Sequence, residues 1–252
     1  MNSKSRRDTR CVFCGRNDLT KEHVFPNWMS KLFLPNTITT TSIDRNGVVE
    51  KNYTSPIFKQ TLKRVCKSCN NGWMSTLEAD TKRIIEPMLF NLQYTINLNQ
   101  TDQSILAFWA QKTCMILSLA TGSDYKLPKE HFINLFTEKK ALDYISVRIG
   151  WRIPKANENG HHLAFYTLSE ITGPIPDKLH IPQGSEVWRS IITIGNIVFH
   201  LSGASGGLRV EIDNNDYRVT PQIYPFVEEL EWPMEWPVDA LTSVGASEFG
   251  RV

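Results

Sequence analysis

The chain has 252 residues, of which 41% are hydrophobic and 10% aromatic, so it can bury a sizeable core and is not disordered throughout. No stretch approaches the roughly 18 uninterrupted apolar residues that cross a bilayer. The basic start is followed by Asp8 and Cys11 rather than by an apolar segment, so we expect no secretory signal. These features predict a soluble, cytoplasmic protein with no membrane partner.

The net charge of +2 conceals an asymmetry along the chain. Residues 1–86 contain 15 Lys and Arg against 8 Asp and Glu, a net charge of +7, whereas residues 87–252 contain 13 against 18, a net charge of −5. A basic first third indicates an anionic partner for that part of the chain. DNA is the first candidate and RNA stays open, while a basic face that contacts only solvent explains the charge equally well.

Four of the five cysteines form two pairs with the same spacing, Cys11/Cys14 and Cys66/Cys69. Each C-x2-C turn places two thiolates on one side of a tight turn, so two such turns can complete a tetrahedral shell. In an intracellular chain this pattern indicates structural zinc rather than disulfides. A redox dithiol and unrelated thiols are the alternatives, but neither explains why the spacing occurs twice. The fifth cysteine, Cys114, is expected to be a small core residue.

Strand and turn signals lie between the two cysteine pairs. Residues 37–43 are rich in β-branched side chains and predict a strand, Asn46-Gly47 predicts a hairpin turn, and residues 48–58 predict the returning strand. Fifty-one residues separate Cys14 from Cys66. This spacing predicts that the hairpin is a folded insert rather than a slack loop.

A helix is predicted directly after the second cysteine pair. Apolar residues keep a helical spacing from Trp73 until Pro87 interrupts the pattern. Asn70 or Asn71 is suited to cap this helix at its N-terminus. The zinc ion is therefore expected to join the strand region to the start of a helix.

A second unit is predicted after the first, with helices followed by strands. Its helices are expected near residues 105–122 and 129–140, and its strands at 144–153, 162–168, 188–201, 208–212 and 217–224. The predicted fold class is therefore α+β, with one domain at residues 1–92 and a larger α+β domain at residues 93–252. The role of the larger domain, in regulation, sensing or assembly, is open, as is a homo-oligomer or a regulatory partner.

The residues around the cysteine pairs resemble the HNH endonucleases, whose active site is a ββα-metal core. Many members place an acidic-His dipeptide, followed by an apolar residue and often Pro, after the first C-x2-C pair, and His or Asn directly after the last Cys. Here the segment Glu-His-Val-Phe-Pro occupies residues 22–26, and Asn70 follows Cys69. The resemblance covers about residues 10–85, and it is to a subgroup with Asn in place of the final His.

The resemblance implies metal-dependent hydrolysis of phosphodiester bonds in DNA, in enzymes that often serve bacterial antiviral defence or mobile elements. It implies that His23 is the general base that activates water. Glu22 and Asn70 are then the ligands of one catalytic Mg²⁺ or Mn²⁺, with Asn71 as the substitute for Asn70. The structural alternatives are a surface role for His23, a hydrogen bond from Glu22 that only orients His23, and a helix-capping role for Asn70.

The sequence departs from the family at three places. The family commonly has Asp where Glu22 stands, and it often has the middle Asn of its name where Thr61 stands. The insert between the cysteine pairs is also long. Asn46, Asn52 or Gln60 could supply the missing amide.

Basic residues flank the second cysteine pair, namely Lys59, Lys63, Arg64 and Lys67. Contacts from these side chains to a phosphate backbone predict affinity that depends on salt but not on base sequence. The alternative function for the chain is a non-catalytic zinc module that binds nucleic acid or a protein partner, and the departures at Glu22 and Thr61 favour it. A third hypothesis is a structural protein whose zinc only supports the fold.

Overall fold

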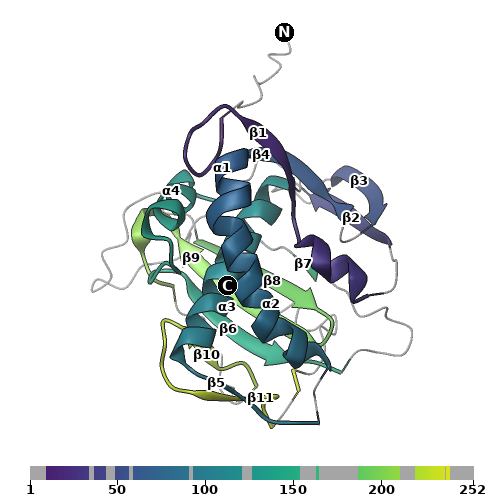
Figure 1. Cartoon of the computed structure of the whole chain (residues 1–252), viewed down its shortest axis with the longest axis vertical. Helices are drawn as coiled ribbons and strands as arrows, with labels where there is room; N and C mark the ends of the chain where they lie inside the picture. Colours follow the sequence, from purple (N-terminus) through teal and green to yellow (C-terminus); the bar gives the residue numbers. More distant parts are fainter. Residues whose placement is uncertain are drawn as a thin grey trace.

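A computed structural model of the chain describes residues 10–33, 37–43, 49–56, 59–90, 93–120, 127–153, 163–164, 187–210, 219–235 and 237–238. Helices and antiparallel strands are mixed along it, so the predicted α+β class is confirmed (Figure 1). In chain order, the elements are β1 (Leu19–His23), a 3₁₀ turn (Asn27–Lys31), β2 (Thr37–Ile43), β3 (Val49–Pro56), β4 (Thr61–Cys66), α1 (Lys67–Cys69), a π-helical turn (Asn70–Met74), α2 (Ser75–Phe90), β5 (Ile96–Leu98), α3 (Gln100–Ala120), α4 (Lys129–Glu138), β6 (Ser146–Trp151), β7 (Leu163–Ala164), β8 (Val187–Ile194), β9 (Ile197–Ala204), a 3₁₀ turn (Ser205–Gly207), β10 (Gln222–Tyr224) and β11 (Leu230–Trp232).

The first strand pair joins β1 to β4 in an antiparallel ladder. His23 lies opposite Thr61, and Glu22 lies opposite Leu62. The register shifts between Thr20, which pairs with Val65, and Glu22. Two residues of β4, Lys63 and Arg64, therefore lie opposite Lys21, so the β-bulge is in β4. A bulge leaves a backbone carbonyl outside the ladder and changes the direction of the side chains that follow. This irregularity therefore lies opposite the residue that directly precedes Glu22 and His23.

A separate hairpin, β2 paired with β3, lies between β1 and β4 in the sequence. Its strands confirm the two predicted at residues 37–43 and 48–58. The predicted turn at Asn46-Gly47, and with it Asn46 as a candidate amide, lies outside the described residues. The hairpin stands beside β1 and β4 in Figure 1 and shares no ladder with them.

The helix after β4 begins earlier than predicted and ends later. Its cap is Cys66, whose sulfur accepts the backbone N–H of Cys69 at 3.4 Å, so neither Asn70 nor Asn71 is the N-cap. Pro87 does not end the helix, because α2 continues to Phe90. Pro87 has no N–H to donate to the carbonyl of Arg83, so the helix continues past it with one α-helical hydrogen bond fewer.

The largest sheet has the strand order β10-β6-β9-β8-β7, and all of its pairings are antiparallel. One predicted strand, residues 188–201, is two strands joined by a tight turn at Gly195, whose φ is +59°. The strand predicted at 208–212 is wrong over residues 208–210, which are not in a strand. No helix in the described part of the chain is long and apolar enough to span a membrane.

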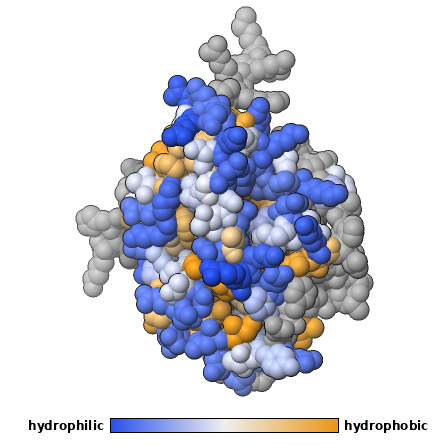
Figure 2. Space-filling model, viewed as in Figure 1, coloured by the Kyte–Doolittle hydropathy of each residue, from blue (hydrophilic) through white to orange (hydrophobic). Residues whose placement is uncertain are grey.

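The helix α3 packs against this sheet on one side and against α2 on the other. A single cluster of buried side chains runs through these layers, from Ile85 and Met88 of α2 to Trp109 of α3 and Phe199 of β9. The C-terminal end of α2 is also tied to the sheet, because the carbonyl of Met88 accepts hydrogen bonds from Asn196 at 3.3 Å and Trp232 at 3.2 Å. The face shown in Figure 2 is largely hydrophilic, most densely over β1, β4 and the start of α2.

Because the core crosses the predicted boundary at residues 92 and 93, a fragment of residues 1–92 is expected to lose cooperative folding. The fragment exposes the face of α2 that packs on α3, and a helix of this length has little stability alone. Thermal unfolding followed by circular dichroism checks this, with the zinc-loaded full chain as the control. A sharp, reversible transition in the zinc-loaded fragment would contradict the expectation and establish two independently folding domains.

Candidate metal centre and active site

The four paired cysteines lie together, with their sulfur atoms all within 4.8 Å of one another. The first pair comes from the loop before β1, and the second comes from the end of β4 and from α1. A hydrogen bond from Val12 N–H to the Arg64 carbonyl, 3.0 Å long, holds that loop against β4. Within the described residues this is the one group of three or more His, Cys, Asp or Glu side chains placed to hold a metal ion.

The pKa values of the thiols at this centre depend on one another, because their sulfur atoms are closely packed. Cys69 donates a hydrogen bond that lowers the pKa of Cys11 to about 4, and the same contact raises the pKa of Cys69. Burial raises the pKa of Cys14. Tetrahedral zinc with Zn–S bonds of about 2.3 Å separates its sulfurs by about 3.8 Å, and the closest pair, Cys14 and Cys66, lies at 3.4 Å. The donor set and its size therefore suit an ion such as zinc.

Glu22 is the most unusual carboxylate near this centre. Its side chain is 3% exposed, and it makes no hydrogen bond or ion pair with any described residue. Burial raises the pKa of Glu22 to about 7, the ammonium of Lys112 opposes that rise, and the carboxylate of Glu78 adds to it. A buried carboxylate without a partner is costly, which makes it a candidate ligand for a cation.

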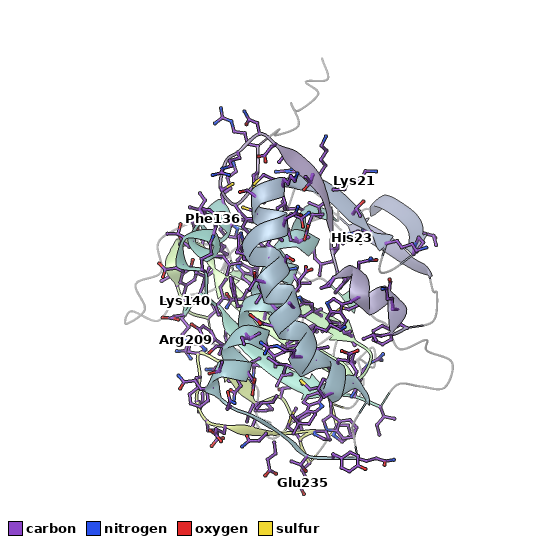
Figure 3. All side chains as sticks on the ribbon, in the orientation of Figure 1. Lys21, His23, Phe136, Lys140, Arg209 and Glu235 are labelled. Atoms are coloured by element: carbon purple, nitrogen blue, oxygen red, sulfur yellow. The ribbon has the colours of Figure 1, made fainter. Side chains whose placement is uncertain are left out.

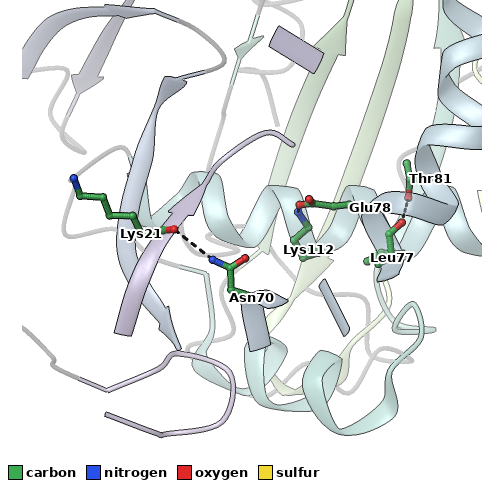
Figure 4. Close-up of polar contacts among 6 residues, drawn as sticks. All are labelled: Lys21, Asn70, Leu77, Glu78, Thr81 and Lys112. Atoms are coloured by element: carbon green, nitrogen blue, oxygen red, sulfur yellow. Dashed lines mark hydrogen bonds and ion pairs between the residues drawn. The ribbon is translucent and has the colours of Figure 1, made fainter. Parts of the chain in front are cut away.

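The cation that opposes the rise in the pKa of Glu22 comes from the second predicted unit. Lys112 of α3 is completely buried, and its Nζ lies 3.0 Å from Oε1 of Glu78 on α2 (Figure 4). Sequence reasoning missed both residues of this pair. The available signal was that Lys112 is the sole charged residue between Asp102 and Asp124. Such a lysine is rarely buried without a carboxylate partner.

His23 and Asn70 both lie at β1, whereas Asn71 is exposed on the helix. His23 is half-buried at the end of the strand, and Figure 3 shows it there together with Lys21. The Asn70 amide donates to the Lys21 carbonyl at 3.3 Å and to Thr20 Oγ1 at 3.2 Å (Figure 4). The amide nitrogen is thus held against β1, and the amide oxygen is left to accept or to coordinate.

Thr61 occupies the position of the family's middle asparagine, and the described residues that could supply its amide instead differ in where they lie relative to His23. Thr61 lies directly opposite His23 and is exposed. The carbonyl of the neighbouring Gln60 accepts the Val24 N–H at 3.0 Å, which places Gln60 beside the end of β1. Asn52 lies in β3, opposite Thr41 and in a different ladder.

The predicted basic residues divide into two groups. Lys59, Lys63 and Lys67 are exposed, whereas Arg64 is half-buried and its Nε is enclosed without a hydrogen-bond partner among the described residues. Lys21 is a further exposed cation that the sequence did not single out, and it lies in β1 opposite the bulge of β4.

Comparisons with known protein families, with curated proteins and with solved structures find no match. What this chain does is therefore inferred from its own residues.

We expect the purified chain to bind one equivalent of zinc and to lose most of it when Cys69 is replaced by Ser. Removing one thiolate leaves an incomplete shell, and because the metal joins two segments, its loss should also lower the unfolding temperature. Metal content by mass spectrometry and thermal unfolding test this. Cys114→Ala is the matched control, since Cys114 lies in α3 and should leave zinc bound. Equal zinc contents in both variants would refute the four-cysteine site.

The raised pKa of Glu22 predicts that Glu22→Gln stabilises the chain at alkaline pH. The folded state holds the Glu22 proton up to about pH 7, whereas the unfolded chain releases it near pH 4.3, so stability falls as pH rises between these values. The variant removes that loss of stability, and its gain should be small at pH 5 and at most about 4 kcal/mol at pH 8.

Urea unfolding at both pH values, without added Mg²⁺ or Mn²⁺, measures this gain. Glu138→Gln is the control, because Glu138 is exposed at the end of α4. A gain for Glu22→Gln that does not change with pH would show that Glu22 has an ordinary pKa.

Proposed function

We propose that this chain is a metal-dependent endonuclease of the HNH type that hydrolyses phosphodiester bonds in DNA, with structural zinc on the four cysteines. The observation that carries the proposal is the buried, unpartnered carboxylate of Glu22 beside His23, with the Asn70 amide held against the same strand. A setting in bacterial defence or on mobile elements rests on the family resemblance alone.

The order of the elements supports the proposal. Two antiparallel strands, β1 and β4, are followed by the helical segment that begins with α1. The acidic-His dipeptide lies at the end of the first strand, and the asparagine lies in the first turns of the helix. This arrangement has the order of the ββα-metal core that the sequence resembles, with the β2–β3 hairpin as an insert.

The residues of the site divide the chemical work. His23 takes a proton from water on one of its ring nitrogens, because an imidazole titrates near neutral pH. Glu22 and the Asn70 oxygen hold Mg²⁺ or Mn²⁺, which supplies charge stabilisation at the phosphate when bound. The unpartnered Glu22 carboxylate fits that ion, since carboxylate and amide oxygens are its preferred ligands.

The cysteine centre positions this site. Cys69 is a ligand and directly precedes Asn70, so the thiolate bond to zinc also fixes the start of the asparagine's backbone. The other pair fixes the loop that leads into β1. A zinc ion at this place therefore holds strand and helix in the geometry that the Asn70 hydrogen bonds require.

The exposed lysines are the proposed contacts with the phosphate backbone. Lys59, Lys63 and Lys67 belong to β4 and its flanks, and Lys21 lies in the paired strand β1, opposite the bulge. Arg64 is the weaker candidate of the predicted set, because its guanidinium is partly enclosed. Contacts of this kind bind DNA or RNA without reading base sequence.

One observation favours the alternative, a non-catalytic zinc module that binds nucleic acid or a protein. The position of the family's middle asparagine is held by Thr61, whose hydroxyl is exposed opposite His23. In that case Glu22 is only a buried acid, and His23 has no chemical step to perform.

Plasmid cleavage with added Mg²⁺ or Mn²⁺ tests the proposal. We expect metal-dependent nicking by the zinc-loaded chain, and a loss of at least about a hundredfold in His23→Ala, the usual effect of removing a general base. Asn70→Ala should lose activity, whereas Asn71→Ala should keep it because Asn71 is exposed.

Zinc content and thermal unfolding of each variant are the controls for folding. No cleavage by the zinc-loaded wild type at any Mn²⁺ concentration, or equal cleavage by wild type and His23→Ala, would refute the nuclease. Retained DNA affinity in an inactive wild type would then favour the binding module.

A further inference from the structure

Lys139 has a backbone conformation that its side chain makes unfavourable. It follows the last residue of α4 with φ +54° and ψ +31°, and its N–H bonds to the Leu135 carbonyl. In the described part of the chain it is the one non-glycine residue with a positive φ. Glycine is the usual residue at such a helix end. A lysine here suggests that the side chain has a task, because strained residues cluster at functional positions.

The side chain of Lys139 reaches the metal centre. Its ammonium lies 5.0 Å from the centre of the Trp73 ring, and it donates a hydrogen bond to the carbonyl of Phe136. Burial lowers the pKa of this ammonium, and the charges of Cys69 and Cys14 oppose that shift, so both thiols lie within electrostatic range of it. Figure 3 shows Phe136 of the same segment to the left of the upper part of the helix that begins at α1, with Lys140 lower on the same side.

Trp73 lies between the cysteine centre and the second predicted unit. Its ring stacks on Phe108 of α3, with centroids 5.4 Å apart and planes 12° apart, and it meets the edge of Phe13, which lies between Cys11 and Cys14, at 5.4 Å. The contact with Cys11 and burial raise the pKa of the Cys69 thiol, and the indole N–H of Trp73 acts in the opposite direction. It is also buried without a regular hydrogen-bond partner among the described residues.

We propose that Lys139 and Trp73 form the outer shell of the metal centre, Lys139 as the cation that offsets the charge of four zinc-bound thiolates and Trp73 as an N–H donor to Cys69. Four thiolates on Zn²⁺ carry a net charge of −2, and outer-shell donors and cations stabilise such a centre. The inference rests on the zinc of the proposed function and not on the nuclease activity. It makes metal retention depend on α4, an element outside the residues that resemble the HNH family.

The test compares zinc release from Lys139→Gly, Lys139→Arg and the matched control Lys140→Gly, using a colorimetric chelator and the full chain. Lys140 is the adjacent exposed lysine, paired with Glu138 at 3.7 Å. We expect zinc to be released about tenfold faster from Lys139→Gly than from the wild type. This is the lower limit of the effect usual for an outer-shell residue, because Lys139 is exposed. Lys139→Arg should stay within about twofold of wild type, and Lys140→Gly should match it.

Two further readouts separate this role from a structural one. Glycine relieves the backbone strain, so the unfolding temperature of Lys139→Gly in excess zinc should not fall. The difference in release rate between wild type and Lys139→Gly should shrink at 1 M salt, because an exposed charge is screened. Trp73→Phe keeps the ring and removes the N–H, and it should also release zinc faster.

Equal release rates in Lys139→Gly and Lys140→Gly would overturn the role of Lys139. The role is also overturned if Lys139→Gly releases zinc faster, unfolds at a lower temperature and is not rescued by Lys139→Arg. That combination would show that Lys139 only stabilises the C-terminal end of α4. A wild type that holds no zinc refutes the zinc and this inference together. A wild type that holds zinc but cuts no DNA refutes only the nuclease, and the release rates still decide the outer shell.

Discussion

The structure around β1 depends on the convergence of four sulfur atoms from two segments that are far apart in the sequence. Cys66 has three roles at once, because it ends β4, caps the following helix through its sulfur and joins the cluster. Cys69 joins the same cluster one residue before Asn70. Four thiolates at these separations repel one another unless a cation binds them, so the local geometry and metal binding are coupled. The position of Asn70 against β1 follows from that coupling.

The second constraint is charge buried between α2, α3 and β1. Lys112 is completely enclosed, Glu78 is its ion-pair partner, and the Glu22 carboxylate is close enough for both to influence its pKa. Buried ion pairs add little net stability, because desolvation offsets most of the attraction. A hydrophobic residue at position 112 would fit the apolar surroundings of α3 with less penalty. A group that adds little stability and adjoins an unpartnered carboxylate is better explained by the needs of a site than by those of the core.

Local sequence signals predicted the parts of the fold that depend on local physics. The paired cysteines, the β-branched strand at 37–43 and the apolar spacing of α3 each reflect a rule that acts within a few residues. The turn at Gly195 was missed because both flanking strands are largely buried and themselves contain polar residues, so Asn196 does not stand out as a break between 188 and 201. Lys112 and Lys139 were missed for another reason. Their partners come from other elements, and no spacing rule connects residues 78 and 112, or 73 and 139.

The π-helical turn at Asn70–Met74 shows how one irregularity in a helix can place residues at two sites. An ordinary α-helix places residues three apart on nearly the same face, yet Asn70 contacts β1 and Trp73 contacts Phe108 and Phe13. The Ser75 N–H bonds to the Asn70 carbonyl, and Gly72, with φ −95° and ψ −115°, leaves helical geometry. Single wide turns of this kind are frequent at functional sites. Here the turn presents the amide to the candidate active site and the indole to the candidate metal centre, so a regular helix through residue 72 would have to give up one of the two contacts.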